Sequence, residues 1–394
     1  MNIIVTGAKG FIGKNLVYTL KNIQEGKDKS FGIDKDIKIF EYDTHTDLEL
    51  LNVYCEKADF VYHLAGINRP LNQEEFMTGN LGFTSFLLDT LKKYNNTCPV
   101  MMASSIQAEL DNPYGLSKRA GEDLLFAYAR ETGAKVYVYR FPNVFGKWCR
   151  PNYNSAVATF CYNIARDLPI QVNDPNRMMT LVYIDDVVAE LIGALAGQAN
   201  IKDKFCCVLV EHRIRLGDIV SLLYSYKESR KTKYVPDMPE NSFSKKLYST
   251  YLSYLPEEEF SYPLRMNIDD RGSFTEILKT SDKGQFSVNI SKPGVTKGEH
   301  WHHTKNEKFV VVSGKAVIRF RKVGIDPETG EEYPIIEYHV TGDKMEVIDI
   351  PTGYTHNITN EGDTDLVTFM WCNECFNPAK PDTYFLEVEN SHEQ

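Results

Sequence analysis

Tyr114 and Lys118 are the two side chains in this sequence best placed for proton transfer. They lie four residues apart in the stretch 112–118, and residues four apart share one face of a helix. A free tyrosine titrates near ~10, and a neighbouring ammonium group favours the phenolate, which brings the tyrosine pKa closer to neutrality. Because the same spacing occurs by chance on many amphipathic helices, the rest of the chain has to decide its meaning.

A second group of residues has the types and spacing of metal ligands. Within residues 294–314, His300 and His302 lie two apart and Glu307 follows five residues later, and residues 351–360 add His356. Residues two apart on a strand face the same side, and three imidazoles with a carboxylate suit Zn, Fe or Mn, with zinc as the first choice. An exposed polar turn is the alternative, but the second motif with its own histidine argues against it. The predicted ligands are His300, His302, Glu307 and His356.

The composition is that of a globular, enzyme-like protein. A length of 394 residues exceeds one average domain, so we expect two domains. The net charge of -10 argues against nucleic acid as a partner and favours small molecules. No apolar run has membrane-spanning length, and the first residues have the pattern of a strand, not of a signal peptide. Together with eight scattered cysteines, these features predict a cytoplasmic protein.

The first residues have the pattern of a dinucleotide-binding loop. The apolar strand 2–6 runs directly into three regularly spaced glycines, and a helical pattern follows to about residue 20. Glycines permit a tight turn and close approach to a pyrophosphate, and the helix amino terminus supplies N–H groups and the positive end of its dipole. The predicted contacts to the dinucleotide are Gly7, Lys9, Gly10, Phe11, Ile12 and Gly13.

The end of the second predicted strand bears on the choice of dinucleotide. Strand 37–42 is followed by Asp43, whose carboxylate can pair with a ribose hydroxyl and so favours NAD. A ribose phosphate prefers a basic residue, and Lys9 is the nearby candidate. From these residues alone, the choice between NAD and NADP stays open.

Strand and helix patterns alternate as far as Lys118. Strands are expected at 59–66 and 100–105, with a helix around 80–94 between them. This alternation predicts a parallel sheet with helices on both faces. Ser105 lies nine positions before Tyr114 at the end of a strand, where such sheets present their ligand-binding residues.

These motifs, taken in order, resemble the extended short-chain dehydrogenase/reductase family. The resemblance implies that Tyr114 is the acid-base group and that Lys118 lowers its pKa and holds the nicotinamide ribose. It implies that Ser105 polarises the reacting oxygen and that Asn80 supports a proton relay. It also implies that residues after the third strand contact the cofactor. The motifs are the glycine loop, His63-Leu64-Ala65-Gly66, Asn80, Ser105, Tyr114 and Lys118.

Two later segments, 140–146 and 183–187, resemble the landmarks that bracket the sugar-nucleotide pocket in this family. Dehydratases carry an acidic pair directly after the active-site serine or threonine, and Ile106-Gln107 occupies that place, so dehydration is not expected. An arginine common before the second landmark is replaced by Met179. The predicted substrate contacts are Asn143, Arg150 and Arg177, with Lys147 as a further candidate for the diphosphate and a solvated basic loop as the alternative for each basic residue.

The periodicity changes in the last third of the chain. We predict a reductase domain over 1–243, a linker over 244–261 and an all-β domain over 262–394 with short strands between glycines. The two histidine motifs resemble the paired motifs of the cupin superfamily. Segment 270–276 resembles the opening of cupin-type deoxysugar epimerases, whose own sites need no metal. The expected fold class is a Rossmann-like doubly wound parallel sheet followed by an all-β cupin barrel.

Nearly the whole chain resembles a family of two-domain enzymes of capsular polysaccharide biosynthesis, notably at 145–155, 247–256 and 297–315. The resemblance implies a bifunctional homodimer on the route to UDP-N-acetyl-L-fucosamine. The cupin would invert C3 of a UDP-2-acetamido-2,6-dideoxy-4-hexulose, and the first domain would reduce C4 with NADPH to give UDP-2-acetamido-2,6-dideoxy-L-talose. That family has a basic residue where this chain has Asp43, so NADH is the second candidate.

Other interpretations are also open. The cupin could be a metal-stabilised dimerisation and sugar-binding module beside a simple reductase. A 4-epimerase would keep its dinucleotide bound and never consume it. A protein that only senses the dinucleotide would have no need of Ser105, Tyr114 and Lys118. The proton-abstracting base of the cupin is left unranked among Lys297, His303, Lys308 and Tyr338.

Overall fold

The structure, a computed structural model, describes residues 1–67, 72 and 76–389. The chain forms two compact units that are interleaved in sequence. Unit 1 comprises Met1–Tyr224 and Pro239–Pro256, and unit 2 comprises Ser225–Met238 and Glu257–Gln394. Residues 390–394 of the predicted second domain lie outside the described part. No helix in the described ranges is long and apolar enough to cross a membrane, and all eight cysteines are free thiols.

Unit 1 is built on a seven-stranded sheet with the order β2-β1-β3-β4-β5-β9-β8. Strands β1 to β5 and β9 pair in parallel, and the short β8 pairs antiparallel with β9. The predicted parallel sheet is confirmed. The strands are β1 (Asn2–Thr6), β2 (Lys38–Tyr42), β3 (Phe60–His63), β4 (Val100–Ser105), β5 (Val136–Phe141), β8 (Ile201–Lys202) and β9 (Phe205–Cys206).

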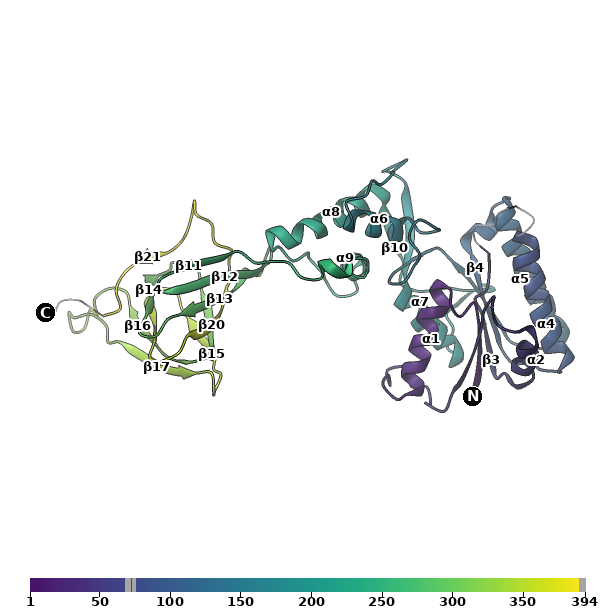
Figure 1. The fold of residues 1–394 in the computed structure, drawn as a ribbon, viewed down its shortest axis with the longest axis horizontal. Coiled ribbons are helices and arrows are strands. Elements are labelled where there is room, and N and C mark those ends of the chain that lie inside the picture. Colours follow the sequence, from purple (N-terminus) through teal and green to yellow (C-terminus); the bar gives the residue numbers. More distant parts are fainter. Residues whose placement is uncertain (68–71, 73–75, 390–394) are drawn as a thin grey trace. The chain divides into compact units, whose positions relative to one another are not determined.

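Helices cover both faces of this sheet (Figure 1). Strand residues alternate between two cores. Ile3 and Val5 of β1 pack with α1 and α7, whereas Ile4 packs on the other face with α2, α4 and α5. This alternation follows from the two-residue period of a strand. The helices are α1 (Phe11–Gln24), α2 (Leu48–Lys57), α4 (Phe83–Lys93), α5 (Pro113–Thr132) and α7 (Ile184–Leu195), with the π-helix η1 (Met77–Gly82) before α4 and the 3-10 helix η2 (Ile106–Glu109) before α5.

A smaller sheet and further helices follow β5. The three-stranded sheet has the order β10-β7-β6, with β6 and β7 parallel and β7 and β10 antiparallel. It presents the segments that were predicted to bracket the substrate pocket. The elements are β6 (Asn143–Phe145), β7 (Met178–Tyr183), β10 (His212–Arg215), α6 (Ala156–Ala165), α8 (Leu216–Thr232) and α9 (Phe243–Leu252).

The division into units differs from the predicted domain boundaries. Most of α9 lies in the predicted linker 244–261, and Lys246 Nζ of this helix lies 2.7 Å from Asp186 Oδ2 of α7. The helix therefore belongs to unit 1, and its Leu247 and Tyr251 are buried there. Conversely, segment 225–238 belongs to unit 2, where the Val235 N–H donates to Lys279 O at 2.8 Å.

Unit 2 consists of two antiparallel sheets that share one core. Side chains from both sheets, among them Phe309 and Ile358, form a single buried cluster. The prediction of an all-strand region is confirmed, and among the described residues the two hydrogen-bonded ladders stay separate. The six-stranded sheet runs β11 (Met266–Asp269), β12 (Gly272–Lys279), β13 (Gln285–Ser291), β20 (Leu366–Cys372), β15 (Glu307–Ser313) and β18 (Ile348–Ile350). The five-stranded sheet runs β17 (Ile336–Thr341), β16 (Lys315–Lys322), β19 (Tyr354–Asn360), β14 (Thr296–Trp301) and β21 (Tyr384–Phe385), and the 3-10 helix η3 (Glu257–Glu259) precedes β11.

Candidate functional site

The glycine loop between β1 and α1 lies against the backbone that follows β3. Gly7 has a φ of +65°, and a Cβ at this position would lie 2.8 Å from Ala65 N. A Cβ on Gly13 would lie 2.0 Å from Gly7 O. Both positions therefore exclude larger residues, the first also because L side chains rarely adopt that φ. The loop and the segment Leu64–Gly66, both predicted to bind the dinucleotide, are thus brought together.

Asp43 lies beside the glycine loop at the carboxyl end of β2. Its Oδ2 accepts the Lys9 N–H at 2.7 Å, and its Oδ1 accepts the Thr44 N–H at 2.8 Å. A carboxylate in this place can accept hydrogen bonds from ribose hydroxyls and repels a ribose phosphate. The backbone of Lys9, which the sequence offered as a basic contact, is engaged by Asp43.

Ser105 and Tyr114 meet where β4 ends and α5 begins. Helix α5 begins at Pro113, a residue favoured in the first turn of a helix. Asn112 caps this end, because its Oδ1 accepts the Gly115 N–H at 2.8 Å. The Ser105 hydroxyl hydrogen-bonds the Tyr114 side chain. The predicted serine and tyrosine are therefore in contact.

Lys118 lies one turn further along α5 and is buried. Its Nζ donates to Ala103 O at 3.1 Å and lies 5.9 Å from the Tyr114 ring centre. Burial lowers the pKa of Lys118 to about 8. Burial also raises the pKa of Tyr114, and the Ser105 hydrogen bond lowers it by less. The predicted lowering of the Tyr114 pKa is wrong for this arrangement, because burial of the phenol outweighs the hydrogen bond from Ser105.

Asn80 joins this group from the π-helix η1. Its Oδ1 accepts the Ile67 N–H at 2.7 Å, and its Nδ2 donates to Ser117 Oγ at 3.1 Å. A Cβ on Gly66 would lie 3.1 Å from Lys118 Nζ and 3.2 Å from Asn80 Oδ1. Asn80 and Lys118 therefore both approach the segment after β3, next to the glycine loop, and Lys118 in turn lies beside Tyr114.

His63 lies beneath this group. Its Nδ1 is 2.9 Å from Thr6 Oγ1, and its Nε2 is 2.9 Å from Thr84 Oγ1. Because the Thr84 hydroxyl donates to Asn80 O, it accepts a proton from His63, which assigns the Nε2–H tautomer. Burial, and secondarily the charge of Lys118, lowers the pKa of His63 to about 3. The sequence marked this histidine only as part of a motif, and its bonding to both threonines required the structure.

The predicted substrate residues lie around the smaller sheet. Arg177 lines a cavity of about 450 Å³ together with Tyr153. The guanidinium of Arg150 stacks 5.2 Å from the ring centre of Tyr153. Asn143 Nδ2 donates to Thr180 O at 3.3 Å, and Lys147 Nζ pairs with Asp185 Oδ1 at 2.5 Å. Arg177 is therefore the candidate that borders a cavity, whereas Lys147 is engaged by a carboxylate.

The four predicted metal ligands converge in unit 2 from three elements. His300 lies in β14 and His302 directly follows this strand, while Glu307 begins β15 and His356 lies in β19. One ligand atom from each residue lies within 4.8 Å of the others. Glu307 Oε2 lies 3.7 Å from His302 Nε2 and 3.6 Å from His356 Nε2. The sequence prediction that separate strands bring these side chains together is confirmed.

This donor set fits a divalent cation. His302 Nε2 and both ring nitrogens of His356 are buried and make no hydrogen bond. Burial lowers the pKa of His300 to about 4, which keeps its imidazole neutral. Burial raises the pKa of Glu307, but the imidazoles of His302 and His356, whose Nε2 atoms lie 3.7 and 3.6 Å from its Oε2, outweigh this and hold it well below its usual range. Neutral imidazoles beside a carboxylate are what zinc requires.

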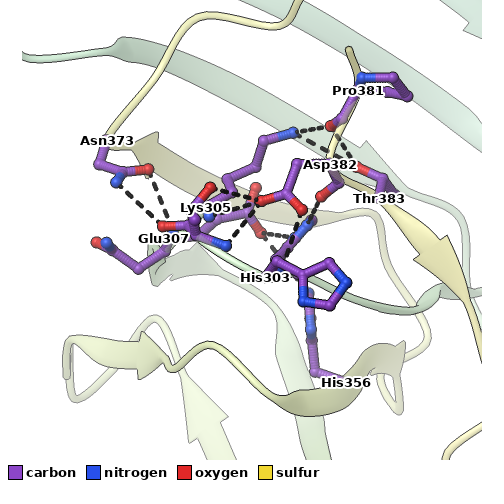
Figure 2. Close-up of polar contacts among 11 residues, drawn as sticks. His303, Lys305, Glu307, His356, Asn373, Pro381, Asp382 and Thr383 are labelled. Atoms are coloured by element: carbon purple, nitrogen blue, oxygen red, sulfur yellow. Dashed lines mark hydrogen bonds and ion pairs between the residues drawn. The ribbon is translucent and has the colours of Figure 1, made fainter.

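Asp382 orients the loop that carries His302 (Figure 2). Its backbone O is 2.5 Å from His302 Nδ1, so that His302 Nε2 faces the cluster. Its carboxylate accepts the N–H groups of His303, Thr304 and Lys305 at 2.9–3.0 Å. Asp382 lies 80 residues after His302 in the chain, and no sequence motif indicated that it would hold the His302 loop in place.

The ligand cluster borders a cavity of about 530 Å³. Its walls include the apolar side chains of Phe309 and Ile358 and the polar side chains of Arg271, Asn289 and Lys297. Arg271 lay inside a segment that the sequence singled out, and Lys297 was one of four unranked bases. Asn289 was missed, because a single asparagine in a strand carries no signal.

Comparison with known proteins covers both units. Residues 3–204 of the 394 match the NAD dependent epimerase/dehydratase family. The chain belongs to this family. Residues 267–384 match the polysaccharide biosynthesis C-terminal domain. In this member of the NAD dependent epimerase/dehydratase family, the glycine loop and the Tyr114 group thus lie in the family domain, and the histidine cluster lies in the second domain.

Relatives with the same pair of domains are similar over nearly the whole chain. The UDP-2-acetamido-2,6-beta-L-arabino-hexul-4-ose reductase of Pseudomonas aeruginosa is 43% identical over 388 residues, 98% of this chain and 99% of that protein. The capsular polysaccharide assembling protein CapF of Staphylococcus aureus is 56% identical and superimposes with a TM-score of 0.90, over 98% of this chain and 100% of that structure. The UDP-glucuronic acid 4-epimerase of Bacillus cereus in complex with NAD, at 21% identity and a TM-score of 0.52 over 66% of this chain and 100% of that structure, shares the fold. The resemblance to CapF therefore extends over both units.

Proposed function

We propose that this chain is a bifunctional sugar-nucleotide enzyme of capsular or surface polysaccharide biosynthesis. Unit 2 inverts C3 of a UDP-2-acetamido-2,6-dideoxy-4-hexulose, and unit 1 then reduces its C4 ketone to give UDP-2-acetamido-2,6-dideoxy-L-talose. The product would serve the route to UDP-N-acetyl-L-fucosamine. The names of the Pseudomonas 4-ulose reductase and of CapF support this substrate class and this process. The proposal includes a homodimer, which is carried by the resemblance alone.

The observation that carries the reductase is the contact of Ser105 with Tyr114 beside the glycine loop, with Lys118 and Asn80 next to them. Bound NAD(P)H would supply the hydride to C4. The Tyr114 hydroxyl donates the proton that the C4 oxygen gains, and Ser105 hydrogen-bonds the same oxygen. Lys118 binds the nicotinamide ribose, and Asn80 supports the return of the proton to Tyr114.

NADPH is the proposed reductant on the resemblance, and NADH is the alternative. The position of Asp43 beside the Lys9 N–H favours NADH, because a carboxylate repels the additional phosphate of NADPH. Steady-state rates with the two cofactors at equal concentrations decide between them.

Unit 2 is proposed to be a cupin that acts before the reduction. The ketone acidifies the hydrogen on C3, and reduction would destroy it, so that epimerisation must come first. A zinc ion on His300, His302, Glu307 and His356 would polarise the C4 carbonyl as a Lewis acid. The cavity of about 530 Å³ beside these ligands gives room for the sugar ring.

The proposal is tested by measuring deuterium uptake into the 4-keto UDP-sugar in heavy water without dinucleotide. Exchange at C3, followed by oxidation of NADPH or NADH upon its addition, is the expected result. Prompt oxidation of the cofactor without exchange would mean that unit 1 is a simple reductase. Exchange at C3 with no net cofactor oxidation would instead indicate that unit 1 is a 4-epimerase, which keeps its dinucleotide bound and does not consume it.

A second function for unit 2 is favoured by the Asp382 contacts. Because these bonds tie the carboxyl-terminal segment to the His302 loop, a metal there would also stabilise the unit. In this alternative, unit 2 binds sugar and assembles the dimer without chemistry. Replacement of His302 would then lower stability or affinity, while C3 exchange would be undetectable in the unaltered protein as well.

A further inference from the structure

Lys297 is the candidate base that lies in the cavity of unit 2. The sequence offered Lys297, His303, Lys308 and Tyr338 without a ranking. Among the described residues that line the cavity, Lys297 appears together with His300, Glu307 and His356, and the other three candidates do not. Both Lys297 and His300 belong to β14, with a bulge between Gly298 and His300. The metal-binding and amine groups are therefore neighbours on one wall.

The other three candidates are engaged elsewhere. His303 packs edge-on against Trp301 at 4.4 Å between ring centres. Lys308 follows Glu307 in β15 and therefore faces the opposite side of the strand, where it pairs with Asp349. Tyr338, in the edge strand β17, is exposed and packs against Phe320.

The amine of Lys297 is held in a defined direction. Its Nζ lies 2.9 Å from Asn289 Oδ1 and 2.9 Å from Ile290 O, both in β13. Asn289 is buried and its Nδ2 donates to Ser291 Oγ at 3.0 Å, which leaves Oδ1 as the acceptor for the lysine. A neutral amine that donates both of its protons to these two oxygens has its lone pair in the remaining tetrahedral direction.

We propose that Lys297 is the base that removes the C3 proton of the 4-keto sugar. This inference rests on the proposed epimerase function of unit 2. The Lys297 lone pair forms a bond to the C3 proton, and the C–H electron pair becomes the C3–C4 double bond as the carbonyl pair moves to the C4 oxygen. A water molecule returns a proton to the opposite face of C3, the C4 carbonyl re-forms, and the resulting hydroxide takes the proton from the lysine. The step is neutral overall and needs no oxidant or reductant.

The surroundings favour an unprotonated amine. Burial lowers the pKa of Lys297, the nearby charge of Asp269 raises it and that of Arg271 lowers it, and the net direction is downward. Asp269 and Arg271 form an ion pair at 2.6 Å, so that the two charges offset one another at the amine. A base with a lowered pKa is present in its active form at a lower pH than an exposed lysine.

The test is C3 deuterium exchange, without dinucleotide, by the full-length protein and by Lys297→Ala. We expect Lys297→Ala to lose about 10²-fold or more of the exchange rate, the usual contribution of a positioned base. Methylamine or ethylamine should restore part of the rate in proportion to its concentration, because the truncated side chain leaves room for a small amine. The same amines should not accelerate Lys297→Met, in which the space is filled.

Lys292→Ala is the matched control, because Lys292 lies in the same region but is exposed and paired with Asp365 at 3.0 Å. It should exchange at the rate of the unaltered protein. Zinc content per chain and reduction of the already epimerised sugar should be the same for all variants. If the unaltered protein shows no exchange, the proposed epimerase function fails. If it exchanges and Lys297→Ala does so within about threefold, or loses exchange without rescue by either amine, Lys297 is not the base.

Discussion

Replacement of His63 by glutamine should remove a large part of the acid sensitivity of unit 1. His63 is 3% exposed and sits between the Thr6 and Thr84 hydroxyls, one of which donates to Asn80. Protonation would place a second N–H against the Thr6 hydroxyl, which in turn accepts the Ala65 N–H at 3.2 Å. Folding therefore requires the neutral imidazole. His63→Gln keeps a polar side chain of similar length that does not titrate.

The sign and size of the effect follow from the difference in pKa between folded and unfolded chains. The unfolded histidine binds a proton near pH 6.5, whereas the pKa of His63 in the folded chain is lowered to about 3. Stability that is fully present above pH 6.5 is therefore lost as the pH falls towards 3, because the unfolded state binds the additional proton. Between pH 6.5 and 5 the loss is about 1.4 kcal/mol per pH unit, or about 2 kcal/mol in all.

Two buried methionines allow this to be measured in unit 1 alone. Met101 and Met102 of β4 are 0% and 4% exposed, and their oxidation by peroxide across a urea series, followed by mass spectrometry, reports the unfolding of this unit in the full chain. Between pH 7 and pH 5 the unaltered protein should lose about 2 kcal/mol more free energy of unfolding than His63→Gln. Equal losses in both proteins would refute the assignment of a neutral, buried His63.

Two further predictions concern the two sites, and a third concerns the buried ion pair of Glu122 with Arg140. Tyr114→Phe should lower kcat for ketone reduction by about 10²–10⁴-fold, because the proton donor is lost, while the dissociation constant of the dinucleotide, measured by fluorescence, changes far less; an unchanged kcat would contradict the role of Tyr114. Glu307→Gln removes the anionic ligand of the histidine cluster and should weaken zinc binding by more than about tenfold in a competitive chelator titration, and a variant that retains its zinc would show that Glu307 is no ligand. Glu122→Gln should destabilise unit 1 by about 3 kcal/mol in the methionine oxidation assay, because Arg140, 2.6 Å from this buried carboxylate, would keep a poorly compensated charge. A loss below about 0.5 kcal/mol would mean that Arg140 is solvated well enough without its partner.

The structure bears out those sequence predictions that depended on local geometry. The glycine loop, the strands up to β4 and the helix α5 were predicted because tight turns, two-residue alternation and the four-residue spacing are properties of a few neighbouring residues. The convergence of His300 and His302 with Glu307 and His356 was also predicted. Two histidines that lie two apart on a strand share a face, and a further histidine in a second motif favours a shared metal site over an exposed polar turn.

Predictions that depended on tertiary contacts between different segments of the chain were less successful. The linker 244–261 was placed across α9, since the sequence does not show that Lys246 reaches Asp186 on another helix. The pKa of Tyr114 was expected to be lowered, since spacing places Lys118 beside it but does not show that other segments bury Tyr114 and so raise its pKa. Both differences arise from contacts between residues that are distant in the chain or on another element.

By itself, the sequence determined the class of each unit and most of the residues of both candidate sites. Turn geometry and side-chain periodicity depend on a few neighbouring residues, so short stretches of chain are enough to predict them. Tertiary structure decided which of the candidates face a common cavity. Lys297 is distinguished from Lys308 by the pairing of β14 and β15 with their own neighbours, and His302 is oriented by Asp382 from the far end of the chain. These choices depend on how strands pair, and pairing is set by the burial of a whole sheet face, which no short motif encodes.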